Sequence, residues 1–140
     1  MAYLFDTDAI SELFKPRPSE RYVRWLAGVP REDQFTSAVV IGELFAGAYR
    51  SRARPRHLKN IRDQVVPKLT VVPYDGALAE TYGRIRAEVE DAGRRLADAD
   101  LQIAATAIAR GLTLVTGNVR HYERVAGLTL ERVLADSRRK

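Results

Sequence analysis

Short apolar runs alternate along the chain with longer stretches in which apolar residues recur every three or four positions. The short runs predict buried β-strands, and the longer stretches predict amphipathic helices. We expect strands at residues 2–5, 35–37, 69–72, 112–115 and 128–130, and helices at 7–14, from 19 onward, around 39–48, at 76–92 and at 99–109. Strands that alternate with helices in this way are typical of an α/β domain with a mainly parallel sheet.

Composition narrows the class of protein. Hydrophobic residues make up 46% of the 140 positions, which is enough for one core, so we expect a single domain over residues 1–140. The chain has no cysteine, which excludes disulfides, thiolate nucleophiles and zinc ribbons, and its two histidines exclude a multi-histidine metal centre. The first residues lack the basic start of a signal peptide, and no apolar run reaches the length of a membrane span. We therefore expect a cytoplasmic protein without membrane contact.

The charge balance favours a polyanionic partner. Lys and Arg number 23 against 18 Asp and Glu, which gives a net charge of +5. A dense basic run is interrupted by Pro55, which predicts a break between two helices, and Arg138, Arg139 and Lys140 form a basic tail. If the partner is RNA, both segments are candidates for phosphate contacts, and the alternative is a solvated basic face. The residues of the run are Arg50, Arg52, Arg54, Arg56, Lys59 and Arg62.

Acidic and amide side chains follow the predicted strands. Asp6 ends the first strand, Glu43 lies in the helix after the second, Asp98 and Asp100 open the Ala-rich helix, and Asn118 follows the strand at 112–115. Ligands of parallel sheets collect at the carboxyl ends of the strands. Carboxylates brought together there repel one another, and a hard divalent cation such as Mg²⁺ or Mn²⁺ would relieve that repulsion. The spacing thus predicts a metal site.

Each of these residues also has a simpler interpretation. Asp98 or Asp100 could cap a helix, and so could Asp6 at the end of its strand. Glu43 could reach solvent or pair with Arg50. Asn118 could be an ordinary turn residue. Their joint placement at strand ends and helix starts favours one common site over four independent explanations.

Three segments resemble PIN-domain toxins of the VapC family. They are YLFDTDAISEL at residues 3–13, VVIGELFAGAYRS at 39–51 and DADLQIAATAIARGLTLVTGNVRHYERVAGL at 98–128, in the order expected for that family. The resemblance spans nearly the whole chain. It implies a PIN-like three-layer α/β/α sandwich and the ribonuclease toxin of a type II toxin–antitoxin pair.

The resemblance also implies roles for individual residues. Asp6, Glu43 and Asp100 match the core acids of the family, and Asp98 is an auxiliary ligand or only a cap. Asn118 stands where many PIN domains carry an aspartate, which leaves open whether one or two metal ions bind. We expect Mg²⁺-dependent hydrolysis of RNA to a 5′-phosphate and a 3′-hydroxyl, with Mn²⁺ as a possible substitute. Asp6 and Asp100 would hold the ion, Glu43 would bind it or orient water, and Asn118 with Thr116 would position water or phosphate.

The family further implies partners. We expect a VapB-like antitoxin that packs near the first helices and inserts a basic group among the acids. A homodimer is expected, with a heterotetramer or larger assembly on antitoxin binding, and DNA contact only through the antitoxin. Phe14, Tyr22 and Trp25 could stack on RNA bases, or they could belong to the core or to a partner contact.

Two other functions stay open at this point. A receiver-like signalling domain would use Asp6 and Asp8 around a phospho-accepting aspartate, for which the chain offers Asp75. It also needs a lysine after a later strand, and residues 116–122 contain none. The second alternative is a catalytically silent PIN-like module that binds RNA or a partner, which Asn118 favours. Metal-dependent turnover separates that module from the enzyme.

Overall fold

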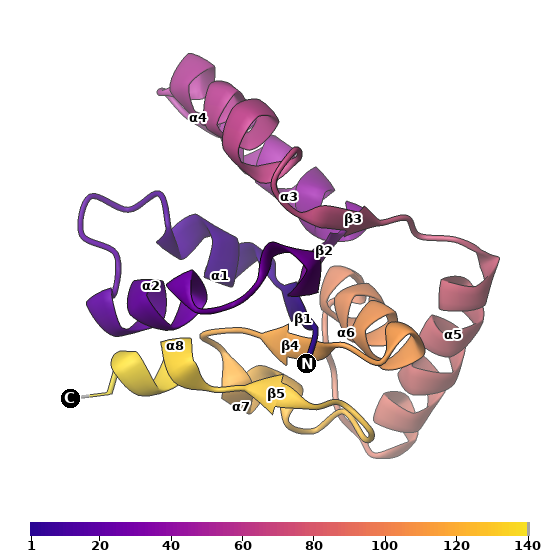
Figure 1. The fold of residues 1–140 in the computed structure, drawn as a ribbon. Helices are drawn as coiled ribbons and strands as arrows, with labels where there is room; N and C mark the ends of the chain where they lie inside the picture. The colour runs from indigo at the N-terminus through magenta and orange to yellow at the C-terminus, as the bar shows by residue number, and fades with distance from the viewer. Residues whose placement is uncertain (140) are drawn as a thin grey trace.

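The computed structural model describes residues 1–139 as a five-stranded sheet with helices packed around it (Figure 1). The elements in chain order are β1 (Tyr3–Phe5), α1 (Thr7–Glu12), α2 (Glu20–Ala27), the 3₁₀ turn η1 (Arg31–Asp33), β2 (Gln34–Ser37), α3 (Ala38–Arg50), α4 (Arg54–Asn60), the π-helical turn η2 (Ile61–Val65), β3 (Thr70–Val72), α5 (Gly76–Asp91), α6 (Asp98–Arg110), β4 (Thr113–Val115), α7 (Val119–Tyr122), β5 (Leu130–Glu131) and α8 (Val133–Ser137).

All strand pairings in the sheet are parallel, and the strand order is β3-β2-β1-β4-β5. The central strand β1 pairs with β2 on one side, where Leu4 faces Phe35, and with β4 on the other, where Leu4 faces Leu114. The chain leaves β1 toward β2 and leaves β4 toward β5. The connections therefore diverge between β1 and β4, and this topological switch point is where α/β sheets place their ligands.

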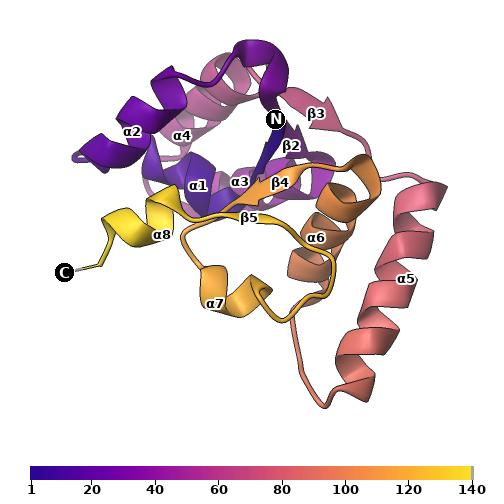
Figure 2. The same cartoon turned by 60° about the horizontal axis from the view of Figure 1, so that its bottom comes forward.

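The helices cover the sheet from two sides and confirm the three-layer sandwich. Crossovers between parallel strands are right-handed, so connections that run in opposite directions along the sheet lie on opposite faces. Figure 2 shows α2 and α4 on one side of the sheet and α6 and α7 on the other, with α5 outside α6. Buried residues from β1, β4 and α6 form the centre of the core, including Leu4, Ile103 and Leu114.

Most predicted elements are confirmed, with small differences at their ends. The last strand begins at Leu130 rather than at residue 128, although the Thr129 carbonyl already accepts a 2.9 Å hydrogen bond from the Leu114 N–H of β4. The predicted break between two helices in the basic run is confirmed, because α3 ends at Arg50 and α4 begins at Arg54. Pro55 lies in the first turn of α4, where its missing N–H costs nothing. Within residues 1–139, no helix is long and apolar enough to cross a membrane.

Candidate active site

A pocket at the carboxyl edge of the sheet collects side chains that are far apart in the sequence. Three predicted acids lie in it, each from a different element, and Asp8 of α1 adds a fourth carboxylate. The strand ends and the start of α6 meet here because every strand runs the same way and α6 returns antiparallel to them. The residues that line this acidic pocket include Asp6, Asp8, Glu43, Asp100, Asn118, His121 and Tyr122.

Asp6 is the most deeply buried of these acids, with 4% of its surface exposed. It is also the N-cap of α1, since its Oδ1 accepts a hydrogen bond of 2.8 Å from the Ala9 N–H. Burial raises the pKa of Asp6 to about 7, and the charges of Asp8 and Asp100 add to this rise. The hydrogen bonds from Thr116 and Ala9 oppose the rise without cancelling it. Capping and site membership are thus both true of Asp6.

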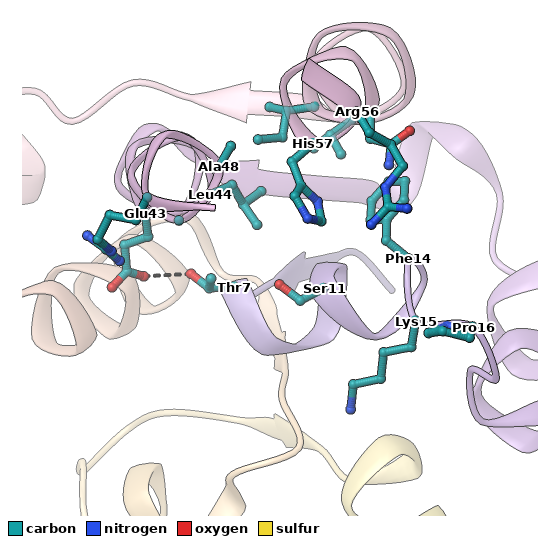
Figure 3. Close-up of a pocket in the computed structure, with 15 residues that line it drawn as sticks. Thr7, Ser11, Phe14, Lys15, Pro16, Glu43, Leu44, Ala48, Arg56 and His57 are labelled. Carbon is teal, nitrogen blue, oxygen red and sulfur yellow. Dashed lines mark hydrogen bonds between the residues drawn. The ribbon is translucent and has the colours of Figure 1, made fainter. Parts of the chain in front are cut away.

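Glu43 faces α1 from the neighbouring helix α3. The Thr7 hydroxyl donates a hydrogen bond of 2.5 Å to Glu43 Oε1, and Figure 3 shows this contact at one end of a groove between the two helices. The bond to Thr7 holds Glu43 toward the acidic pocket rather than in an ion pair with Arg50. That alternative is therefore wrong.

Asp100 is held by two aromatic neighbours on α7. Its Oδ2 lies 2.7 Å from His121 Nε2, and the Tyr122 hydroxyl donates a 3.1 Å hydrogen bond to its Oδ1. Burial raises the pKa of Tyr122 well above its usual value, and the charges of Asp6 and Asp100 contribute, so this phenol stays protonated and acts as a donor. Both carboxylate oxygens of Asp100 are therefore fixed in direction.

Asp98 lies outside the acidic pocket, although only one residue separates it from Asp100. Its Oδ1 accepts a 2.8 Å hydrogen bond from the Tyr82 hydroxyl of α5 and lies 3.6 Å from an Arg86 nitrogen. One residue step along a helix turns a side chain by about 100°, and two steps carry it to the other side. The structure does not bring Asp98 to the other acids. The capping interpretation is wrong for both aspartates, because the N-cap of α6 is Ala97 and forms no side-chain cap bond.

Thr116 and Asn118 stand at the end of β4, as predicted, but in different environments. Thr116 is fully buried, and its Oγ1 accepts a 3.0 Å hydrogen bond from the Asn118 N–H. Because Thr116 also bonds Asp6, it orients that carboxylate from inside the protein rather than contacting solvent directly. Asn118 is exposed at the rim of the acidic pocket and makes no side-chain cap bond to α7.

The aromatic residues near the N-terminus separate into two groups. Tyr22 is fully buried and donates a 2.8 Å hydrogen bond to the Ala9 carbonyl, so of its two interpretations the core position is confirmed and base stacking is excluded. Trp25 packs against Tyr22 and, edge-on, against Tyr3 at a centroid distance of 5.0 Å, so it too belongs to the packing of the domain. Phe14 is 37% exposed and lines the groove of Figure 3.

The residues of the two basic segments differ in their contacts. Arg50 and Arg56 line the groove, whereas Lys59 pairs with Asp63 at 2.7 Å and Arg54 donates to the Tyr49 carbonyl. In the tail, Arg138 forms ion pairs instead of remaining free for RNA. Lys140 lies outside the described residues. Arg52 is exposed, and the Arg62 guanidinium lies 6.0 Å from the centre of the Phe45 ring.

Sequence reasoning missed the side chains that position the acids. Thr7, His121 and Tyr122 hydrogen-bond to the carboxylates, and Asp8, which pairs with Arg138, also lines the acidic pocket. Spacing carried a signal only for Asp8 and Thr7, which directly follow Asp6. The contact between α7 and α6 depends on tertiary packing, for which the sequence offers no local pattern.

The residues fit a hard divalent cation. Among residues 1–139, no Lys or Arg pairs with Asp6, Glu43 or Asp100, so three carboxylates face one pocket without a permanent counter-charge. In the same range, no three Asp, Glu or His side chains form a ready set of direct ligands. Mg²⁺ does not need one, because it keeps several waters and binds through one or two carboxylates. A donor set of carboxylate oxygens therefore suits a hard divalent cation.

A family model for the PIN domain matches residues 3–128. The chain belongs to the PIN-domain family. Among its relatives, the tRNA(fMet)-specific endonuclease VapC of Shigella flexneri is 35% identical over 131 residues, covering 94% of this chain and 97% of the relative. Toxin FitB of Neisseria gonorrhoeae is 34% identical over 118 residues, covering 81% of this chain and 85% of the relative.

Solved structures place the chain in the VapC branch of the PIN-domain family. The DNA-bound VapBC complex of Salmonella typhimurium contains a chain that superposes with a TM-score of 0.85 at 31% identity, covering 94% of this chain and 97% of the other. PIN-domain nucleases generally depend on a divalent metal ion. Membership of this family also excludes the receiver-like alternative, since the family model matches residues 3–128 and the superposition covers 94% of this chain.

Proposed function

We propose that this PIN domain is a Mg²⁺-dependent endoribonuclease and the toxin of a type II toxin–antitoxin pair. The observation that carries the proposal is the acidic pocket, in which Asp6, Glu43 and Asp100 meet without a Lys or Arg partner in the described chain. The similarity to a protein named as an endonuclease and to one named as a toxin supports both parts of it.

Each acid has its own role in the proposed chemistry. A bound Mg²⁺ would polarise the scissile phosphate and lower the pKa of a bound water. Asp6 and Asp100 would hold the ion directly or through water, because Asp6 is buried without a counter-charge and Asp100 is oriented by His121 and Tyr122. Glu43, fixed by Thr7, would bind the ion or orient the attacking water. Asn118 at the rim would position water or phosphate.

The RNA must be held by positive charge outside the acidic pocket. The groove of Figure 3 shares Thr7, Ser11 and Glu43 with that pocket and has Arg50 and Arg56 in its lining. We assign phosphate contacts to these two arginines first. Arg52, Arg54, Lys59 and Arg62 are weaker candidates, because Arg54 and Lys59 already have protein partners and Arg62 lies over the Phe45 ring.

A cognate VapB-like antitoxin would inhibit the enzyme, as the VapBC assembly of the Salmonella relative suggests, and DNA contact would come through that antitoxin. A homodimer and a heterotetramer or larger complex are the expected assemblies. Because the proposed substrate is cellular RNA, the cytoplasm is the proposed place of action.

Neutral variants of two acids test the enzyme directly. We expect Asp6→Asn and Asp100→Asn each to lower the rate of RNA cleavage by about 100-fold or more, because an ion at such a site contributes several kcal/mol to the transition state. The measurement is cleavage of a total RNA pool by antitoxin-free protein in Mg²⁺, in Mn²⁺ and in EDTA, with cut positions mapped.

Asp98→Asn is the matched control. It removes the same charge from the same helix, but its carboxylate bonds Tyr82 outside the acidic pocket, so cleavage should stay within about twofold of the unaltered protein. Full activity of folded Asp6→Asn or Asp100→Asn protein in excess Mg²⁺ removes that residue from the mechanism. If Asp98→Asn lowers the rate of RNA cleavage as much as Asp6→Asn or Asp100→Asn does, Asp98 acts as an auxiliary metal ligand. RNA binding without any metal-dependent cleavage would instead establish the silent module.

A further inference from the structure

A second cavity lies next to the acidic pocket, on the side of α7. It shares Asn118 and His121 with the acidic pocket, so one extended ligand can enter both. Two of its arginines come from the connection between α5 and α6, and two come from α7 and the residues after it. The arginine cavity is defined by Arg94, Arg95, Arg120 and Arg124.

None of these four arginines has an acidic partner within the described chain, and all four line the same cavity. All four are exposed, and within the described chain no carboxylate lies within 4.0 Å of their guanidinium nitrogens. The adjacent acids, Glu90 and Asp98, are already taken by Arg86. Four positive charges around one cavity repel one another, and a polyanion relieves this repulsion.

The position of the arginine cavity indicates how a bound polyanion would run across the protein surface. The acidic pocket lies between the arginine cavity and the groove that carries Arg50 and Arg56, and it shares lining residues with each of them. A single strand laid along the carboxyl edge of the sheet therefore meets positive charge, then the acids, then positive charge again. Only the middle phosphate of such a strand would need a cation in order to approach.

We propose that the arginine cavity binds backbone phosphates of the RNA on one side of the scissile bond, while the groove takes the phosphates on the other side. This inference rests on the proposed nuclease function and adds a substrate path to it. Guanidinium groups suit the task because their planar donors can bind phosphate oxygens in pairs.

The proposed path can be tested by measuring RNA binding with fluorescence anisotropy. The measurement uses a fluorescein-labelled single-stranded RNA and the cleavage-inactive Asp6→Asn protein. We expect the pairs Arg94→Ala/Arg95→Ala and Arg120→Ala/Arg124→Ala each to weaken binding roughly tenfold. Each pair should also reduce the slope of log K against log salt by about 1.4, since a phosphate contact to a single strand contributes about 0.7. Arg21→Ala/Arg24→Ala removes the same charge from exposed positions of α2 and should change affinity less than about twofold.

Neutral linkages identify which phosphates are contacted. In an RNA with a mapped cleavage position, two methylphosphonate linkages on either side should weaken binding to the Asp6→Asn protein. In variants that also lack an arginine pair of the arginine cavity, neutral linkages on one side of the cleavage position should not weaken binding further. Neutral linkages on the other side should weaken binding as much as before. This pattern also distinguishes bound RNA backbone from a free phosphate ion.

The inference is overturned if the arginine-cavity variants bind RNA like the Arg21→Ala/Arg24→Ala control, or if they stay equally sensitive to neutral linkages on both sides. In either case cleavage by the unaltered protein would still support the nuclease. Unaltered protein that neither binds nor cleaves RNA contradicts the proposed function itself.

Discussion

A single buried carboxyl group connects the stability of this protein with its chemistry. Asp6 caps α1, ends the central strand and faces two other acids, yet it has no positive partner among residues 1–139. Its burial favours the protonated form, so the folded protein without metal holds a proton there at a pH where an exposed aspartate would have lost it. Ionising Asp6 therefore costs folding free energy, and a bound cation would offset that cost.

The pH dependence of unfolding follows from the raised pKa of Asp6. An acid whose folded pKa lies above its unfolded value stabilises the protein at low pH, and this contribution is lost as pH rises from about 4 through about 7. We expect a loss on the order of 4 kcal/mol in the free energy of unfolding in EDTA. Asp6→Asn should remove this loss while keeping the cap, so it should be more stable than the unaltered protein at pH 8 and similar to it near pH 4.

Urea unfolding at several pH values, with and without Mg²⁺, measures this difference. Mg²⁺ should stabilise the unaltered protein at pH 8 and have little effect on the Asp6→Asn variant. A difference between the two proteins that does not change with pH would show that Asp6 titrates normally in the folded state.

For individual residues, the sequence predicted the positions of the acids better than it predicted the side chains that hydrogen-bond to them. Asp6 follows the central strand, Asp100 lies in the first turn of α6 and Glu43 lies in the second turn of α3, and the parallel topology brings these positions to one edge of the sheet. The contacts of Asp100 with His121 and Tyr122 depend instead on how α7 packs on α6. A turn of four residues leaves no periodic pattern from which that packing could be predicted.

The short helix α8 is attached to α1 beside the acidic pocket. Arg138, at the end of α8, bonds both oxygens of Asp8 at 2.8 and 3.1 Å and reaches Glu12 at 2.7 Å. Burial acts to raise the pKa of Glu12, but the bonds from Arg138, Lys15 and the Ser19 N–H outweigh it and lower that pKa to about 2. Unlike Asp6, Glu12 is a buried acid with a full set of partners.

Removing this guanidinium should cost stability. We expect Arg138→Ala to lower the free energy of unfolding by roughly 2 kcal/mol, because Glu12 is 4% exposed and loses a charged partner. Arg139→Ala is the matched control, since its exposed side chain makes no ion pair in the described chain, and it should stay within about 0.5 kcal/mol. Equal losses in urea unfolding for the two variants would mean that the contact between α8 and α1 contributes nothing specific.

Gly117 extends the same test to a third element. A Cβ at this position would overlap both the Arg138 guanidinium and the Asp8 carboxylate, so the turn after β4 passes directly over their ion pair. Gly117→Ala should therefore destabilise the unaltered protein more than it destabilises the Arg138→Ala variant, and the four proteins together form a double-mutant cycle. Additive changes in the free energy of unfolding would show that Gly117 does not interact with the ion pair between Arg138 and Asp8.

Among the elements, the sequence predicted the strands and the long helices because hydrophobic periodicity marks them. It predicted neither α7 nor α8, which are four and five residues long and owe their position to tertiary contacts. The sequence also could not predict which basic residues of α4 and of the tail form ion pairs, because composition does not show that Lys59 and Arg138 have acidic partners.

The whole molecule shares one core. Buried residues from Leu4 to Leu134 form a single cluster that includes both sides of the sheet, so no boundary divides the described chain into separately packed parts. This continuity supports the expectation of a single domain.

Cooperative unfolding is the expected consequence. Trp25 is the only tryptophan in the sequence, and it lies in α2 and packs against β1, whereas far-ultraviolet circular dichroism reports all the helices. The two signals should give coincident urea transitions with one midpoint. Transitions that separate would show that the N-terminal region unfolds independently and would contradict the single domain.

The central position of β1 also has a consequence during synthesis on the ribosome. Tyr3, Leu4 and Phe5 leave the exit tunnel before their partners in β4, which are translated only after α6. Until then, one edge of the middle strand has no neighbour, and an open edge invites pairing with other chains. The nascent protein is therefore exposed to aggregation until β4 has been translated. Asp100 is translated only shortly before β4 and Asn118 only after it, so the proposed nuclease site is incomplete until the sheet can close.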